Sequence, residues 1–237
     1  MLNGFVTKTR QGATALVKAV AKSASEPERA AFVAAASINI GASLLGVARA
    51  KKLSKPVLMP LLAGRVLRSS HTPGEKALGI AGLGGGWAGD LVLMKPNSLP
   101  QGAAGFAINH AAYITLLLAK GARPSTLRTT IRAVPLAAAA GFAALREPKL
   151  VPMVLSYGGL LATTSLLADD PHLHDSSVPA SFGLGHGGNL FLISDAVLFA
   201  REMFLSEGTP AAQCADGMVM GTYTIAQLLL VDGLFSK

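Results

Sequence analysis

Residues 77–94 read Ala-Leu-Gly-Ile-Ala-Gly-Leu-Gly-Gly-Gly-Trp-Ala-Gly-Asp-Leu-Val-Leu-Met, and this stretch decides the fold class. It is an apolar run close to the length of about 20 residues that an α-helix needs to cross a bilayer. Its only ionisable residue is Asp90. Because a carboxylate at the centre of a membrane helix costs about 2.5–3.5 kcal/mol on insertion scales, Asp90 is a candidate functional residue.

The composition of the whole chain indicates a membrane protein. Of the 237 residues, 51% are hydrophobic and only 14% are charged, whereas a soluble domain carries about 25% charged residues. The net charge of +8 would fit a nucleic-acid-binding protein, but the basic residues lie in short connectors and aromatic residues make up only 5%. The charge therefore indicates contact with anionic lipid headgroups of the bilayer, and we expect no nucleic-acid partner.

Apolar runs separated by short connectors predict an all-α polytopic membrane bundle of about eight transmembrane helices. Helices are expected because the backbone groups of open strands would be left unpaired in lipid. The predicted spans are residues 30–48, 55–69, 77–94, 99–119, 130–146, 150–168, 180–203 and 213–235. We therefore expect one transmembrane domain over 30–237, in a multi-pass protein of the cell membrane.

Residues 1–29 precede this domain, and two interpretations fit them. Basic residues surround a few aliphatic ones there, as in an amphipathic helix that lies on a membrane surface. A disordered N-terminal tail is the alternative. If the N-terminus is cytoplasmic, 13 of the 21 basic residues fall on the inner side, so the positive-inside rule favours that orientation.

A second acid matches the first. Asp90 stands in Gly-Asp-Leu-Val-Leu-Met, and Asp195 stands in Ser-Asp-Ala-Val-Leu-Phe. Together with a looser match between Lys55-Pro56 and Pro148-Lys149, this fits an internal repeat of four plus four spans. Convergence of apolar helices on similar strings is the alternative. In such a repeat the two acids and Lys55 would lie near one membrane face, with the acids facing each other across the bundle.

Few polar side chains interrupt the predicted spans. His110 and Tyr113 are three residues apart and share a helix face, and Tyr223 and Gln227, four apart, share another. The remaining candidates are Lys55, Tyr157 and Ser194. Each has a structural alternative, because Tyr, Ser and Gln also link membrane helices by hydrogen bonds and a lysine near a span end reaches the interface. The two acids could likewise form a structural ion pair with Lys55 or a histidine.

Two carboxylates in one site are a sufficient acid–base pair, because one can hold a proton while the other stays ionised. Trp87, three residues before Asp90, is expected to cover that acid with its ring. A serine hydrolase is disfavoured because no Gly-x-Ser-x-Gly motif occurs. His110, His186 and the two acids are suitable zinc ligands, but they lack close ligand spacing, so we expect no metal.

The order of short motifs along the spans resembles the YhhN-like lysoplasmalogenase family of eight-span membrane proteins. The motifs are Lys55-Pro56 with Met59-Pro60-Leu61-Leu62, Gly89-Asp90 with Leu93-Met94, Gly102, Phe106, His110 and Tyr113, Pro152 and Tyr157, Gly188, Phe191, Ser194-Asp195 and Phe204, and Tyr223, Ala226 and Gln227. The resemblance covers about residues 30–235. The sequence departs from it at Gly84-Gly85-Gly86, where the family is usually bulkier.

This resemblance implies hydrolysis of the vinyl ether bond of a lysoplasmalogen to a fatty aldehyde and a glycerophospho-headgroup, with no cofactor. It implies that Asp90 and Asp195 are catalytic and that a lysophospholipid substrate meets a set of surrounding side chains. These are Lys55, His110, Tyr113, Tyr157, Ser194, Tyr223 and Gln227. Two alternatives stay open: a non-enzymatic membrane protein that binds lipid or couples transport to protons, and a hydrolase of another lysolipid or enol ether.

Overall fold

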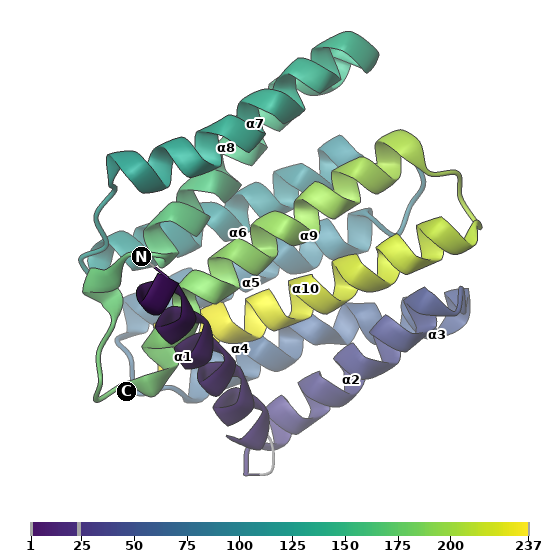
Figure 1. Cartoon of the computed structure of the whole chain (residues 1–237). Coiled ribbons are helices and arrows are strands. Elements are labelled where there is room, and N and C mark those ends of the chain that lie inside the picture. The colour runs from purple at the N-terminus through teal and green to yellow at the C-terminus, as the bar shows by residue number, and fades with distance from the viewer. Residues whose placement is uncertain (1, 23–24, 237) are drawn as a thin grey trace.

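The computed structural model describes residues 2–22 and 25–236, with side chains from residue 9 onward. Within these residues every regular element is a helix, apart from an isolated β-bridge between Asp175 and Val178. The elements are α1 (Leu2–Ala21), α2 (Pro27–Leu44), α3 (Ala48–Ser54), η2 (Lys55–Val57), α4 (Leu58–Arg68), α5 (Pro73–Val92), α6 (Leu99–Ala119), α7 (Thr126–Arg146), η3 (Pro148–Leu150), α8 (Val151–Ala168), η4 (Pro171–Leu173), η5 (Pro179–Gly183), α9 (Leu184–Phe204) and α10 (Pro210–Phe235) (Figure 1). The chain is therefore an all-α bundle, as predicted.

Each of the eight predicted spans contains a helix, and the boundaries differ where capping residues decide them. α5 begins at Pro73 because Thr72 and Glu75 form a reciprocal capping box. α7 begins at Thr126, where the Ser125 hydroxyl accepts a hydrogen bond from the backbone N–H of Arg128. Hydrophobicity alone placed these starts several residues later, because caps are polar.

Within the part of the chain that the structure describes, three helical segments are long and apolar enough to cross a membrane. They are Leu99–Ala119, Pro148–Ala168 and Pro210–Phe235. This finding supports a membrane protein. α4, in contrast, has 11 residues, about half of what a spanning helix needs. The number of eight spans therefore stays a prediction.

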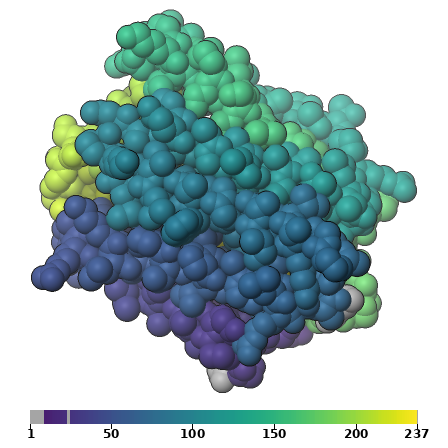
Figure 2. Space-filling view, turned by 180° about the vertical axis from the view of Figure 1, so that it is seen from behind, coloured from purple at the N-terminus to yellow at the C-terminus, as the bar shows by residue number. Residues whose placement is uncertain are grey.

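The helices close into a ring, in which each packs along the next. The order is α2, α4, α5, α6, α8, α9, α10 and back to α2. α7 lies outside this ring against α8, and a view from behind shows α4, α5 and α6 covering most of one face (Figures 1 and 2). The neighbours α4–α5–α6 in the first half recur as α8–α9–α10 in the second, which is the arrangement that the predicted repeat requires.

α10 and α2 seal the ring. The C-terminal half of α10 is buried almost without interruption from Tyr223 to Phe235. At that end the Asp232 carboxylate accepts two hydrogen bonds from the Arg29 guanidinium of α2, and the two residues are 4% and 2% exposed. A buried ion pair thus joins the first helix of the ring to the last.

Glycines allow α5 and α6 to approach each other closely. A Cβ atom added at Gly105 would lie 2.6 Å from the backbone nitrogen of Gly89, and one at Gly85 would lie 2.8 Å from the carbonyl oxygen of Gly105. Small residues at such crossings let helix backbones meet in membrane proteins. The Gly84-Gly85-Gly86 departure therefore contributes, through Gly85, to the packing that sets the position of Asp90.

α1 lies across the end of the bundle where α10 finishes, and it contacts η5 and α10 (Figure 1). Its buried side carries small residues, Gly12, Ala15 and Ala19, whereas Val17 and Val20 are exposed. Residues 2–21 are thus helical and dock on protein through a small-residue face. Contact of the opposite face with a membrane surface stays a prediction.

Candidate active site

One end of the ring encloses a cavity of about 900 Å³. Its walls come from the C-terminal halves of α5 and α9, the N-terminal halves of α6, α8 and α10, the middle of α7 and the stretch from α3 to η2. Most of the wall is apolar, including Leu99, Phe106, Leu136 and Phe199. Its polar part includes six of the nine predicted site residues, namely Lys55, Asp90, Tyr157, Ser194, Asp195 and Tyr223.

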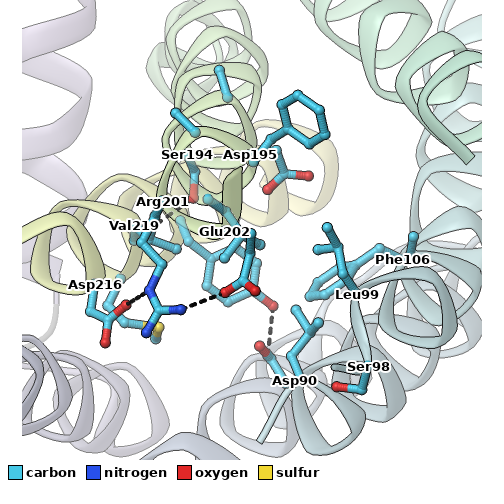
Figure 3. Close-up of a pocket in the computed structure, with 18 of the residues that line it drawn as sticks. Asp90, Ser98, Leu99, Phe106, Ser194, Asp195, Arg201, Glu202, Asp216 and Val219 are labelled. Carbon is cyan, nitrogen blue, oxygen red and sulfur yellow. Dashed lines mark hydrogen bonds and ion pairs between the residues drawn. The ribbon is translucent and has the colours of Figure 1, made fainter. Parts of the chain in front are cut away.

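The two predicted acids reach this cavity from different helices. Asp90 extends from α5 and Asp195 from α9, and they point into the space from opposite sides (Figure 3). Asp90 lies two residues before the last residue of α5, whereas Asp195 lies near the middle of α9. The structure thus brings the acids together, while their catalytic role stays a prediction.

Asp90 is almost fully buried, at 2% exposed, and both of its oxygens are occupied. Oδ1 lies 3.2 Å from the Lys55 ammonium, and Oδ2 accepts a hydrogen bond of 2.8 Å from the Tyr223 hydroxyl. The Tyr223 hydroxyl also lies 3.5 Å from Sδ of Met59. A buried carboxylate needs such a cation and such a donor, because an unpaired charge is costly away from water.

A hydrogen bond from Trp87 holds the backbone that carries Lys55. The indole N–H donates to the carbonyl oxygen of Pro56 over 2.8 Å. The prediction that the Trp87 ring covers Asp90 is wrong, because this side chain is 40% exposed and is not part of the cavity wall. Three residues along a helix rotate by about 300°, so the Trp87 and Asp90 side chains leave α5 in directions about 60° apart. This difference turns the Trp87 ring toward η2.

Asp195 has different surroundings. It is half-buried and accepts a hydrogen bond from the Tyr157 hydroxyl. The same hydroxyl lies 3.4 Å from Nε2 of His110, whose Nδ1 lies 3.1 Å from the Thr164 hydroxyl. A line of polar groups therefore leads from the cavity into the α6–α8 interface, and Thr164 is a member that the sequence did not single out.

An aromatic cluster separates the two tyrosines that contact the acids. Phe191 packs against His110 with ring centroids 4.6 Å apart and against Tyr223 at 5.4 Å. Phe106 lies edge-on to Tyr223 at 5.8 Å. The Phe106 and Phe191 rings therefore fix the orientation of the His110 and Tyr223 side chains.

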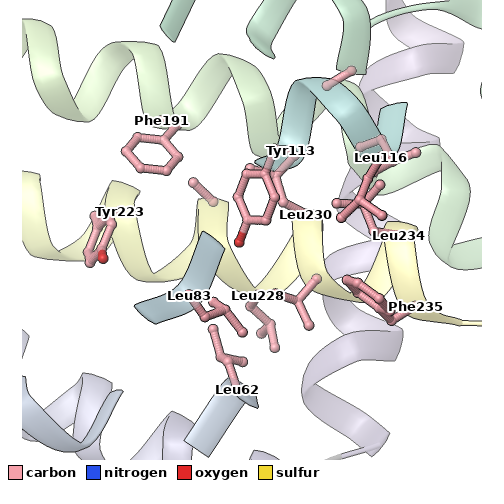
Figure 4. Close-up of a cluster of buried hydrophobic side chains, with 14 of the residues drawn as sticks. Leu62, Leu83, Tyr113, Leu116, Phe191, Tyr223, Leu228, Leu230, Leu234 and Phe235 are labelled. Carbon is pink, nitrogen blue, oxygen red and sulfur yellow. The ribbon is translucent and has the colours of Figure 1, made fainter. Parts of the chain in front are cut away.

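The remaining predicted residues lie behind the cavity wall. Tyr113 donates to Oε1 of Gln227 over 2.5 Å, Gln227 donates to Asn109, and Asn109 donates to the carbonyl oxygen of Gly82 over 2.9 Å. Figure 4 shows Tyr113 among leucines of the core, away from Tyr223. His110, Tyr113 and Gln227 are therefore in position to support the site, but they do not line the cavity. Ser194 lines it, with its hydroxyl directed to the carbonyl oxygen of Val219 at 3.0 Å.

Charged residues that the sequence did not single out surround the cavity further toward one end. Asp216 accepts from Lys51 over 3.0 Å and from Arg201 over 3.1 Å, and Arg201 also contacts Glu202 at 2.7 Å (Figure 3). Lys52 and Lys95 belong to the same wall. The sequence places these charged residues near the ends of apolar runs. It does not show that they surround one cavity, because that depends on how the helices close into the ring.

A second buried polar cluster lies between α7, α8 and α9. Nε of Arg132 donates to Ser165 over 3.1 Å, and its Nη2 lies 3.0 Å from Asp169 and 2.7 Å from the Asn189 side-chain oxygen. Arg132 and Asp232 are charged residues inside predicted spans, which was the signal that could have found them. Among the side chains that the structure describes, no group of three His, Cys, Asp or Glu residues is close enough to hold a metal ion.

A comparison with protein-family models matches residues 50–234 to the YhhN family. The chain belongs to the YhhN family. The matched region runs from α3 to the end of α10 and contains both acids with their lysine and tyrosine partners. No curated protein and no solved structure shows significant similarity to this YhhN protein.

Proposed function

We propose that this YhhN protein is a lysoplasmalogenase-like hydrolase of the cell membrane. The substrate would be a single-chain phospholipid with a vinyl ether bond, and the products a fatty aldehyde and a glycerophospho-headgroup. The observation that carries the proposal is the presence of two carboxylates, Asp90 and Asp195, on the wall of one largely apolar cavity. Its volume of about 900 Å³ is in the range of sites that enclose most of a small ligand.

The distribution of charge around the cavity fits an amphiphile that enters from the bilayer. The apolar wall suits an alkyl chain, and the lysines at positions 51, 52, 55 and 95 suit a phosphate. Asp90 touches one of these lysines, Lys55, at 3.2 Å and shares the apolar cavity with Asp195, so the acids would meet the ether bond that joins chain to headgroup. The bilayer is thus both the solvent of the protein and the source of its substrate.

Vinyl ether hydrolysis needs an acid, a carboxylate and water, and no cofactor. An acid transfers its proton to the outer alkene carbon, and the remaining positive charge is shared by the inner carbon and the ether oxygen. A nearby carboxylate stabilises this oxocarbenium ion and accepts a proton from the water that adds to it. The resulting hemiacetal then collapses to an aldehyde and an alcohol. Asp90 and Asp195 would divide these two tasks.

The other polar residues would position the acids or the substrate. Tyr223 and Lys55 hold Asp90, and Tyr157, supported by His110, holds Asp195. Tyr113 and Gln227 would fix the packing behind Tyr223, and Ser194 would shape the wall beside Asp195. Precise placement matters, because a displacement of about 1 Å can lower a rate by about 10²-fold.

The test measures release of aldehyde, alcohol or fatty acid by the purified protein in lipid nanodiscs. The panel contains a lysoplasmenyl lipid, the matched saturated alkyl ether and the matched acyl ester. Release from the vinyl ether alone supports the proposal, and cleavage of the ester alone would assign a different hydrolase. If no member is cleaved although the vinyl ether lipid binds, the non-enzymatic alternatives, lipid binding or proton-coupled transport, take its place.

A further inference from the structure

The two acids differ in what surrounds them, and we propose that this difference assigns their roles: Asp195 holds the proton that is donated to the substrate, and Asp90 is the acid that is ionised when the substrate binds. The inference rests on the proposed function and adds to it the direction in which the proton moves. It follows from the hydrogen-bonding capacity of each neighbour rather than from the position of either acid in the sequence.

Asp90 is surrounded by donors. The Lys55 ammonium at 3.2 Å from Oδ1 has three donors and no acceptor, and the Tyr223 hydroxyl occupies Oδ2 at 2.8 Å. A proton on Oδ1 would face an ammonium group that cannot accept it, and a proton on Oδ2 would require the Tyr223 hydroxyl to turn its own proton away, toward Sδ of Met59. Either proton would also leave Lys55, whose side chain is 17% exposed, without a negative partner. Both effects favour the ionised form of Asp90 before the reaction begins.

Asp195 has the opposite arrangement. Its Oδ2 accepts from Tyr157, and its Oδ1 makes no hydrogen bond to any residue described by the structure. Across the same described residues it forms no ion pair, although it lines the cavity. A carboxyl proton on this side faces the substrate space rather than a lysine. Once the proton has left, Tyr157 remains as a donor to the new carboxylate.

The complete cycle then balances. Asp195 gives its proton to the outer alkene carbon, forming a C–H bond from the alkene electron pair. Water adds to the inner carbon and gives one proton to Asp90. In the collapse, the hemiacetal O–H returns a proton to Asp195 as the C=O bond forms, and the C–O bond to the glyceryl oxygen breaks as that oxygen takes the proton from Asp90. One water is consumed, and both acids regain their starting states.

Asparagine distinguishes the two roles because it imitates a neutral carboxyl group. The Asp195→Asn variant should lose turnover by about 10²–10⁴-fold, the usual worth of a general acid. Its thermal midpoint should stay that of the wild type, because no charge is removed. For the same reason its affinity for a cationic probe should stay within about twofold of the wild-type value. The probe is a single-chain phospholipid analogue with a secondary ammonium in place of the vinyl ether, and the saturated alkyl ether lipid is its neutral control.

The Asp90→Asn variant removes a charge and should bind the ammonium probe about tenfold or more weakly, a difference of about 1.4 kcal/mol, while binding the neutral lipid normally. Because this variant leaves Lys55 unpaired and can fail to fold, the double variant Asp90→Asn with Lys55→Met serves as the second test. It should fold with the wild-type thermal midpoint and remain inactive.

Equal loss of probe affinity in Asp90→Asn and Asp195→Asn would overturn the assignment, as would substantial turnover by Asp195→Asn. These outcomes differ from failure of the proposed function. If the wild-type protein releases no aldehyde from the vinyl ether lipid, the proposed hydrolysis fails. The probe affinities and thermal midpoints still report which acid carries the charge.

Discussion

The indole N–H of Trp87 donates to the carbonyl oxygen of Pro56 over 2.8 Å, and this bond ties α5 to η2. Lys55 precedes Pro56, and Asp90 lies three residues after Trp87 on α5. One bond between two backbone segments therefore sets the distance of a catalytic candidate from its counter-ion. Trp87 is not a member of the ion pair, and its hydrogen bond acts on the pair through the backbone of η2.

Replacing Trp87 with Phe should lower activity without unfolding the protein. Phenylalanine keeps an aromatic ring but removes the N–H donor, and one hydrogen bond contributes about 0.5–1.5 kcal/mol. We expect kcat/KM for aldehyde release to fall about 3–10-fold. The thermal midpoint should change little, because this side chain is 40% exposed. An unchanged kcat/KM would show that Lys55 is held by other contacts.

Thr164 should affect the rate although it does not touch the cavity. Its hydroxyl lies 3.1 Å from Nδ1 of His110, which lies behind Tyr157. In Thr164→Val, His110 loses this partner, and we expect kcat to fall about tenfold, the effect of one buried hydrogen bond, with KM unchanged. Thr163→Val is the matched control, since among the described residues the Thr163 hydroxyl donates only to the Gly159 carbonyl oxygen within α8. A loss of equal size in both variants would contradict the role of Thr164.

Gly105 should not accept even one added methyl group. In Gly105→Ala the new Cβ would lie 2.6 Å from the backbone nitrogen of Gly89, so α5 and α6 must separate. Overpacking of this kind costs about 1–3 kcal/mol, and the thermal midpoint in detergent should fall. Gly141→Ala in α7 is the control, because nothing lies within 4 Å of its added Cβ. It should be neutral or stabilise the helix by about 0.5–1 kcal/mol. The same midpoint for both variants would exclude close α5–α6 packing.

Asp170 should make the stability of the protein depend on acidity. Its burial opposes the charged form, but hydrogen bonds from His172, the Arg123 backbone and Arg128 outweigh that effect and hold its pKa well below the usual value. A lowered folded-state pKa stabilises the fold above the unfolded value of about 3.9, and this contribution is lost as pH falls. Asp170→Asn should therefore lower the thermal midpoint at pH 7.

Thermal midpoints measured at several pH values test this prediction. The difference between wild type and Asp170→Asn should be constant near neutrality and shrink below about pH 4. Asp175→Asn removes an exposed carboxylate from the same connector and should have a smaller effect throughout. A difference that grows as pH falls would contradict the sign of the shift.

Much of the fold could be predicted from the sequence, because apolar length and composition report on helices in lipid. The eight apolar runs correspond to helices, and the two aspartates within them meet at one cavity. The prediction that the two aspartates meet rested mostly on the short sequence match around Asp90 and Asp195. Two helices with similar strings occupy corresponding places in the two halves of the ring.

The partners of the acids were harder to predict, because they depend on how helices rotate and on contacts distant in the chain. Tyr223 pairs with Asp90 and Tyr157 with Asp195, yet nothing in the spacing distinguishes these pairs from the reverse. The prediction that the Trp87 ring covers Asp90 was wrong for the same reason. Arg29 and Asp232 are 203 residues apart, so only the folded chain shows that they neutralise each other.

The contact between α2 and α10 also has a consequence for biosynthesis. These helices are the earliest and latest members of the ring, and the Arg29–Asp232 pair forms only when both are present. A nascent chain that has been synthesised through α9 already carries both acids, but it lacks Tyr223 and the α10 wall of the cavity. Under the proposed function, hydrolysis would therefore begin only after α10 has packed against α2 and α9.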